Sequence, residues 1–127
     1  MPRVFSYQEF ETGSEKVRQY ADKHSPVIMC DSEAVRNMPF RVKVKIGKNV
    51  KHPNAPDHHY EYIQLWNLET LVGEAKIQRS SFGDDPVHIE ADFLLIPKIS
   101  LRLTAVAYCN KHGLWRSEEL FIPIKDE

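Results

Sequence analysis

The sequence predicts an all-β protein, a sandwich of about seven short strands that follows a short N-terminal arm over residues 1–26. Three observations predict it: apolar and polar residues alternate with period two after the arm, the apolar segments have the length of strands, and clusters of turn residues separate them. A chain of 127 residues is long enough for one domain with its own core and too short for two ordinary ones. We therefore expect residues 1–127 to form a single domain.

The N-terminal arm is predicted to be irregular, with one or two helical turns. Thr12 and Glu15 have the spacing of a capping box, which favours a helix over residues 14–20. Pro26 ends any helix before it, because the residue preceding a proline is pushed away from the helical region. His24 is therefore expected on a loop or just beyond the helix end, where its side chain is free to approach another segment.

The rest of the chain is predicted to form seven strands. Phe40–Ile46 is the clearest, because apolar and basic residues alternate in it without interruption, as in a strand with one buried face. Period two also puts Tyr60, Tyr62 and Trp66 on one strand face, which we expect in the core or in an interface. The predicted strands are Val27–Cys30, Phe40–Ile46, Tyr60–Trp66, Leu71–Arg79, Val87–Leu95, Leu101–Cys109 and Leu114–Ile124.

Charge and hydropathy argue against several classes of protein. The formal net charge is -1 and the sequence has no basic block, so nucleic acid is not an expected partner. No apolar run has the length of a membrane span, and Met1–Phe5 lacks the apolar core of a signal peptide. Two cysteines, Cys30 and Cys109, are too few for a disulfide framework. We therefore expect reduced thiols and a cytoplasmic location.

Histidines and one cysteine in three distant segments point to a metal site. His52 and His58 flank a loop stiffened by two prolines, which can hold both imidazoles toward one point. Cys109 and His112 lie three residues apart at the end of a predicted strand, where a turn can bring both donors to one side. His24 supplies a donor from the N-terminal arm. We expect these three segments to close around one iron ion.

The donor set narrows the choice of metal. A structural zinc site usually contains more than one cysteine in a closed tetrahedron. A copper electron carrier is the nearest alternative, because its loop also places a histidine shortly after a cysteine, but it usually has a weak axial methionine. None of the three methionines follows Cys109, although glutamine or a backbone oxygen can replace that ligand. Four imidazoles and one thiolate suit a five-coordinate iron with one open position.

A metal-free function is a further alternative. Cys30 and Cys109, with Trp66 between them, could be the disulfide and the buried tryptophan of an immunoglobulin-like binding module. The details fit this class poorly, since Trp66 lies far from Cys30 in sequence. In addition, Ala107 stands two residues before Cys109, where such a domain has a tyrosine.

Three motifs resemble those of the superoxide reductases, in the small one-iron form of the desulfoferrodoxin family that is also called neelaredoxin. They are Lys23-His24-x-Pro26, His52-Pro53-Asn54 with a histidine six residues after His52, and Cys109-Asn110-x-His112, in the order of the family. The resemblance implies a seven-stranded immunoglobulin-like sandwich, often assembled as a homotetramer. It also implies one mononuclear non-haem iron with an axial thiolate from Cys109 and equatorial imidazoles from His24, His52, His58 and His112.

The resemblance implies an activity and roles for residues around the iron. The reaction would be the one-electron reduction of superoxide to hydrogen peroxide, with electrons from a separate protein such as rubredoxin. Lys23 would attract and orient the anion. Backbone N–H groups around Asn110 and His112 would bond the sulfur of Cys109 and tune the iron. Pro26, in the motif of His24, would likewise lie around the ligands without binding the metal itself.

Asp22 departs from the family pattern, because the family usually has a glutamate there that binds the open position of the oxidised iron. The aspartate side chain is shorter by about one C–C bond, roughly 1.5 Å. Two outcomes follow from the sequence: a shift of the loop brings Asp22 to the iron, or water takes that position.

Overall fold

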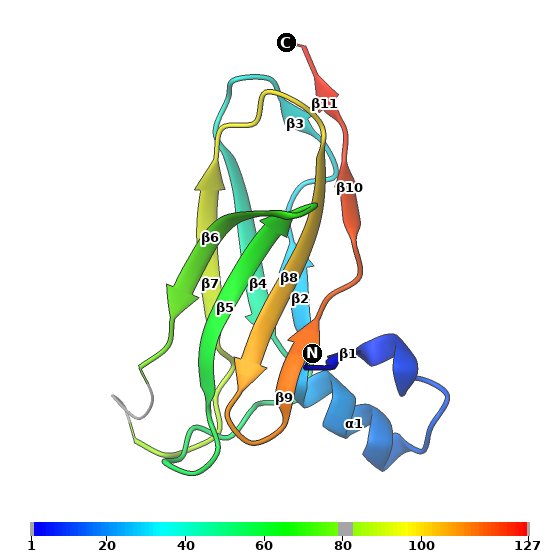
Figure 1. The fold of residues 1–127 in the computed structure, drawn as a ribbon, viewed down its shortest axis with the longest axis vertical. Helices are drawn as coiled ribbons and strands as arrows, with labels where there is room; N and C mark the ends of the chain where they lie inside the picture. Colours follow the sequence, from blue (N-terminus) through cyan, green and yellow to red (C-terminus); the bar gives the residue numbers. More distant parts are fainter. Residues whose placement is uncertain (1, 79–82, 127) are drawn as a thin grey trace.

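The computed structural model describes residues 2–78 and 83–126, and its strands form a two-layered β-sandwich (Figure 1). One layer is a six-stranded sheet in the order β1-β9-β8-β5-β6, with β10 also paired to β8, and the facing layer is β2-β4-β7. A short pair, β11-β3, lies at the end of the sandwich opposite α1. The elements are β1 (Val4–Ser6), a 3-10 turn (Tyr7–Glu9), α1 (Glu15–His24), β2 (Pro26–Met29), β3 (Ala34–Val35), β4 (Phe40–Ile46), β5 (Tyr60–Asn67), β6 (Thr70–Lys76), β7 (Glu90–Leu95), β8 (Leu101–Cys109), β9 (Gly113–Arg116), β10 (Leu120–Ile122) and β11 (Ile124–Lys125).

The N-terminal arm contains more regular structure than predicted. Helix α1 is capped by Ser14, whose side chain accepts the N–H of Val17, so the predicted capping box at Thr12 is wrong. The helix runs one turn further than predicted, to His24, and it is followed by Ser25, whose extended backbone is the conformation expected before a proline. His24 is therefore the last residue of a helix, and the helix fixes the position of its ring.

The core lies between the two sheets and follows the alternation predicted for the central strands. Strands β4 and β8 have the predicted bounds, and alternate residues of each point inward. Burying one such aliphatic side chain contributes about 1.5–3 kcal/mol, so these two strands supply much of the packing energy. The fully buried side chains of the two strands are those of Val42, Val44, Ile46, Leu103, Ala105, Ala107 and Cys109.

Strand β5 contains an irregularity that the sequence pattern did not reveal. Tyr60 pairs with Cys109 but Tyr62 pairs with Tyr108, so one extra residue bulges out of β5. The side chains after the bulge are reversed relative to the prediction: Tyr60 is buried, whereas Tyr62 is half-buried on the outer face and stacks on Tyr108. The bulge turns Tyr60 and Cys109 to the inner face at the same end of the sandwich.

The predicted C-terminal strand, residues 114–124, is three separate strands. A break at residues 117–119 separates β9 from β10, and the Ser117 side chain fills this break by accepting the N–H of Ala105 at 2.9 Å. Pro123 separates β10 from β11, because proline has no N–H to donate to a strand pair. The sandwich therefore has eleven strands within the described residues, more than the seven predicted.

Smaller differences concern the edges of the sheets. The strand predicted from Val87 begins only at Glu90, because Val87 forms an isolated bridge with His52. Strand β6 ends at Lys76, and Arg79, the predicted end of this strand, lies outside the described residues. Within those residues no helix is long and apolar enough to cross a membrane.

Candidate metal centre

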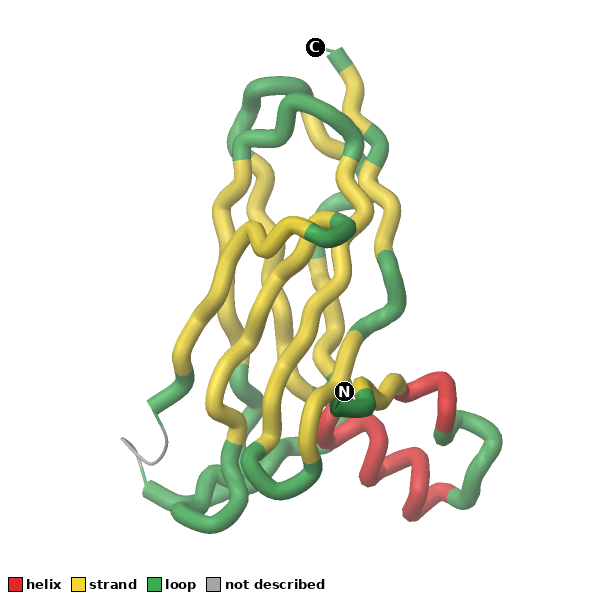
Figure 2. Tube along the Cα trace, viewed as in Figure 1, coloured by secondary structure: helices red, strands yellow, loops and turns green. Residues whose placement is uncertain are grey.

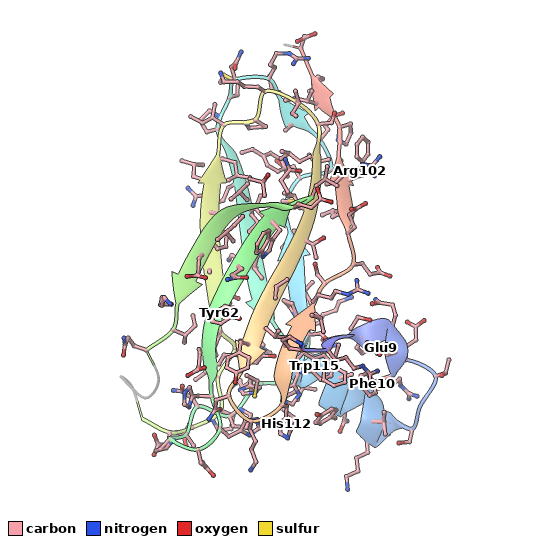
Figure 3. The ribbon with its side chains drawn as sticks, viewed as in Figure 1. Glu9, Phe10, Tyr62, Arg102, His112 and Trp115 are labelled. Atoms are coloured by element: carbon pink, nitrogen blue, oxygen red, sulfur yellow. The ribbon has the colours of Figure 1, made fainter. Side chains whose placement is uncertain are left out.

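The five predicted donors converge at the end of the sandwich where α1 packs, the helix drawn red in Figure 2. His24 ends α1, and Cys109 ends β8. His112 lies in the turn before β9, where Figure 3 shows it beside the helix. His52 is held by its backbone bridge to Val87, and His58 by the tight turn that pairs it with Ala55. We call these five residues the His–Cys cluster: His24, His52, His58, Cys109 and His112.

The four imidazoles form a closed quadrilateral. Neighbouring ring centroids are 4.9 Å apart for His24 and His52, 4.6 Å for His52 and His58, and 4.7 Å both for His58 and His112 and for His112 and His24. Neighbouring rings meet edge to face, whereas His24 and His58 lie across the quadrilateral at 5.8 Å. Donor atoms of His24, His52, His58 and Cys109 lie within 4.8 Å of one another, so one ion can reach them all.

Backbone carbonyls decide which ring nitrogens face the centre of the cluster. His24 Nδ1 lies 2.8 Å from the carbonyl oxygen of Tyr20, and His52 Nδ1 lies 2.6 Å from that of Pro53. A carbonyl only accepts, so each Nδ1 carries the proton and Nε2 has a free lone pair. For His112 the inward atom is Nδ1, which lies 3.1 Å from Nε2 of His24 and 3.1 Å from Nε2 of His58. Three Nε2 atoms and one Nδ1 atom therefore face one point.

These nitrogens have the properties expected of ligands to a cation. Nε2 of His52 is buried and has no hydrogen-bond partner among the described residues, an arrangement that costs free energy unless something binds it. Burial, with smaller opposing and reinforcing effects, lowers the pKa to about 3 for His24, about 3 for His52 and about 4 for His58. The rings of these three histidines are therefore neutral at pH 7, and the Nε2 atoms of His24 and His52 present free lone pairs to the centre of the cluster. A metal ion fits this donor set.

The sulfur of Cys109 has no exposed surface and accepts a hydrogen bond from the backbone of the turn that follows Cys109. Burial raises the pKa of this thiol, while the backbone N–H groups of Lys111 and His112 oppose the rise. The His112 N–H lies 3.4 Å from the sulfur, as predicted, whereas the N–H of Asn110 donates to the carbonyl of His59 instead. The side chain of Asn110 accepts the N–H of His59 at 2.8 Å and donates to the carbonyl of Asp57 at 3.2 Å. Asn110 therefore ties the turn that carries Cys109 to the loop that carries His58.

The cluster is open on one side. His24, His52 and Cys109 are fully buried, but His58 and His112 are only partly covered, so a small molecule can approach past these two rings. Lys23 lies close enough that its charge contributes to lowering the pKa of all four imidazoles, after the larger effect of burial. A cation therefore stands near the cluster.

Three aromatic residues that the sequence analysis did not assign to the site surround the histidines. Tyr60 is buried, packs edge to face on His52 at 4.5 Å and donates its hydroxyl hydrogen to the carbonyl oxygen of His24. Trp115 stacks on His24 at 5.2 Å and donates to the His112 carbonyl at 3.1 Å (Figure 3). Tyr20 lies 4.7 Å from the His24 ring, one helical turn before it. The spacing of four residues between Tyr20 and His24 could have indicated this contact.

Phe5 and Phe10 of the N-terminal arm pack against Trp115 and Tyr20, and together these aromatic residues form a wall beside His24. Phe5 lies 5.2 Å and Phe10 5.5 Å from Trp115, and Phe10 also contacts Tyr20 at 6.2 Å. Strand β1 pairs in parallel with β9, which places Phe5 beside Trp115. The wall packs against the fully buried ring of His24 and, through Tyr20, against the ring of His112 at 5.3 Å, so it keeps water from His24.

Pro26, predicted as an outer residue, and Asp22, considered as a ligand of the oxidised iron, both have structural roles that the geometry defines. Pro26 begins β2, where it pairs with Ile46, and it follows Ser25, the C-cap residue of α1. The carboxylate of Asp22 accepts backbone N–H groups of the loop at residues 48–50.

The alternative of an immunoglobulin-like module with a disulfide is wrong, because Cys30 and Cys109 are both free thiols. Trp66 is half-buried on the outer face of β5 and is not the core tryptophan of such a domain. Met29 and Met38, two of the three methionines that a copper site could have used, are exposed. The third, Met1, lies outside the described residues.

Comparison with known proteins agrees with the geometry. The model of a family described as Desulfoferrodoxin matches residues 16–118. A superoxide reductase of Thermococcus kodakarensis is 37% identical over 103 residues, covering 76% of this chain and 85% of the relative. A neelaredoxin of Megalodesulfovibrio gigas is 30% identical over 111 residues, covering 77% of this chain and 85% of the relative.

Two solved structures of similar fold cover almost the whole chain. A superoxide reductase (neelaredoxin) variant of Archaeoglobus fulgidus, in its reduced form, has a TM-score of 0.68 and 30% identity, and the match covers 93% of this chain and 99% of that one. The superoxide reductase (neelaredoxin) of Ignicoccus hospitalis has a TM-score of 0.74 and covers 96% of this chain and 95% of its own, at 24% identity, which shows the fold.

Proposed function

Because the chain belongs to the desulfoferrodoxin family, we propose that it is a superoxide reductase. The reaction takes one superoxide, one electron and two protons to one hydrogen peroxide, with no release of oxygen. The observation that carries the proposal is the His–Cys cluster, in which five donors from three distant segments face one point and the Nε2 atom of His52 has no partner within the described residues.

Iron is the metal that we assign to the cluster. His24, His52 and His58 would hold it through Nε2, His112 through Nδ1 and Cys109 through its sulfur. When bound, iron supplies the electron that reduces superoxide, and a thiolate ligand donates electron density to it. The protein holds the rings neutral by burial and keeps their orientation through the carbonyls of Tyr20 and Pro53.

Lys23 is the residue to which we assign attraction of the substrate. Its ammonium group lies near the cluster, and the net charge of the whole chain is only -1. A small anion is then guided by local charge and not by the field of the whole molecule. The same ammonium can hold a water molecule that donates a proton to the reduced superoxide.

Replacing Lys23 with alanine is expected to slow the second-order reaction with superoxide while the metal stays bound. The loss should be roughly fivefold at low ionic strength, the factor for about 1 kcal/mol between unit charges 4 Å apart in water. It should shrink as salt is added, because salt screens exposed charges. Pulse radiolysis at several salt concentrations measures it.

The matched control is Lys16→Ala, which removes the same charge from the exposed face of the same helix. This control should react like the unmodified protein. Equal rates for the two variants at low salt would count against a role of Lys23 in steering.

Three further parts of the proposal concern partners and location. The electron donor is proposed to be a rubredoxin or a similar small redox protein. We also propose a homotetramer and a cytoplasmic location, as the resemblance and the two reduced cysteines suggest. Reduction of the oxidised protein by purified rubredoxin, sedimentation analysis and cell fractionation test these parts separately.

The main experiment is anaerobic purification, metal analysis and rapid mixing with superoxide. We expect iron as the bound metal and an amount of hydrogen peroxide equimolar with the iron oxidised. Oxygen evolution in place of net reduction would contradict the proposed reaction. Copper in the metal analysis would point to the electron-carrier alternative.

A further inference from the structure

The carboxylate of Asp22 points to a backbone loop and is fully engaged there. Its Oδ1 accepts the N–H of Lys48 at 3.0 Å, and its Oδ2 accepts the N–H groups of Asn49 at 2.9 Å and Val50 at 2.7 Å. Successive N–H groups that converge in this way form a concave site for an anion. Hydrogen bonds to a charged acceptor are about twice as strong as neutral ones. The carboxylate is therefore firmly bound within the chain.

The loop is shaped to present these N–H groups. Gly47 begins it with a φ of +78°, a left-handed conformation that glycine adopts without strain. A Cβ at this position would lie 2.3 Å from the carbonyl oxygen of Val50, so no side chain fits there. The N–H of Gly47 donates to the carbonyl of Ser25 at 2.9 Å, which adds a second connection between the loop and the end of α1.

Both segments that meet in this contact carry a predicted metal ligand close by in sequence. Asp22 stands two residues before His24 on α1, and Val50 stands two residues before His52. We propose that Asp22 is a positioning residue: its carboxylate fastens the end of α1 to the 47–50 loop and so holds the rings of His24 and His52 at their separation of 4.9 Å. A consequence, which rests on the proposed function, is that Asp22 does not bind iron and the open position is left to the substrate.

The alternative role of Asp22, as a ligand of the oxidised iron, requires the carboxylate to leave the loop. It would have to release three charge-assisted hydrogen bonds, and the N–H groups of Lys48, Asn49 and Val50 would lose their acceptor. The aspartate side chain is also shorter than a glutamate by about 1.5 Å. Both facts favour the contact of the Asp22 carboxylate with the loop over coordination of the metal.

Asp22→Asn tests the proposal, because it keeps the shape of the side chain and removes its charge and part of its accepting capacity. Hydrogen–deuterium exchange of the full-length, iron-loaded protein should accelerate about tenfold in the peptide that covers residues 47–51, the factor for loss of about 1.4 kcal/mol of protection. Release of iron to a chelator should also become faster. The absorption band of the oxidised protein should keep its position.

The control is Asp31→Asn, which neutralises an exposed carboxylate beyond β2. It should change neither exchange at residues 47–51 nor iron release. Unchanged exchange or unchanged iron release in Asp22→Asn would overturn the proposal, and a shifted absorption band would show that Asp22 is a ligand. Exchange and metal release can be followed with whichever metal the chain holds, so failure of the proposed reaction is distinguished from failure of this inference.

Discussion

Replacing Cys109 with serine is expected to abolish the long-wavelength absorption band of the oxidised iron protein and to slow its reaction with superoxide by roughly 100-fold or more. The lower end of this estimate is the loss seen when only an outer partner of a ligand is removed, and a direct ligand should matter more. The sulfur lies in a fully buried position and accepts an N–H from His112 at 3.4 Å. A serine hydroxyl there keeps its proton, so it supplies neither the negative charge nor the electron donation of a thiolate.

The second cysteine provides a matched control. Cys30 is a half-buried free thiol that follows β2 and lines a surface hollow with Phe40 and Lys43. Cys30→Ser changes the same atom, and we expect it to keep both the absorption band and the reaction rate. Visible spectra and stopped-flow or pulse measurements on both variants decide the matter. A band that survives in Cys109→Ser and disappears in Cys30→Ser would disprove the assigned thiolate ligand.

The sequence identified the donors of the cluster because their spacing is local. His52 and His58 flank one stiff loop, and Cys109 and His112 share one turn. In the structure both pairs lie in the cluster with His24, which was predicted as the third segment. The chemistry of each short motif restricts the choice of residues, so the set could be proposed before the segments were seen together.

The direction of the Asp22 side chain could not be predicted in this way. Its three partners lie 26 to 28 residues further along the chain, and they are backbone N–H groups that leave no mark in the residue types. Gly47, whose φ of +78° begins the loop, is a local feature that could have indicated a turn there but not its contact with Asp22. Contacts between a side chain and a distant backbone depend on the fold and have no sequence motif of their own.

The bulge in β5 escaped prediction for a related reason. Period two is counted along one strand, whereas a bulge is defined by the pairing of two strands. The extra residue before Tyr62 reverses the faces of all later residues in β5, so Ile63 and Leu65 are buried and Trp66 is not. The prediction was right for Tyr60, which precedes the bulge and contacts the His–Cys cluster.

Replacing Asn110 with alanine is expected to weaken metal binding by about 10–100-fold, the usual loss when a residue that orients a ligand is removed. Asn110 makes three hydrogen bonds across two segments: its N–H and its side-chain oxygen bond His59, and its side-chain nitrogen bonds the carbonyl of Asp57. These bonds fix the distance between the loop of His58 and the turn of Cys109. Without the side chain, the two ligands can separate when the metal leaves, and rebinding must bring them together again.

Asn67→Ala separates this effect from simple loss of stability. Asn67 lies at the far end of β5, where its side-chain oxygen accepts the N–H of Arg102 at 2.9 Å. Either variant leaves a backbone N–H without its acceptor, so both should lower the free energy of unfolding by about 1–3 kcal/mol in urea titrations. Chelator competition should distinguish them, because only Asn110 joins two ligand-bearing segments. Equal metal affinities in the two variants would mean that the fold alone positions His58 and Cys109, without the Asn110 side chain.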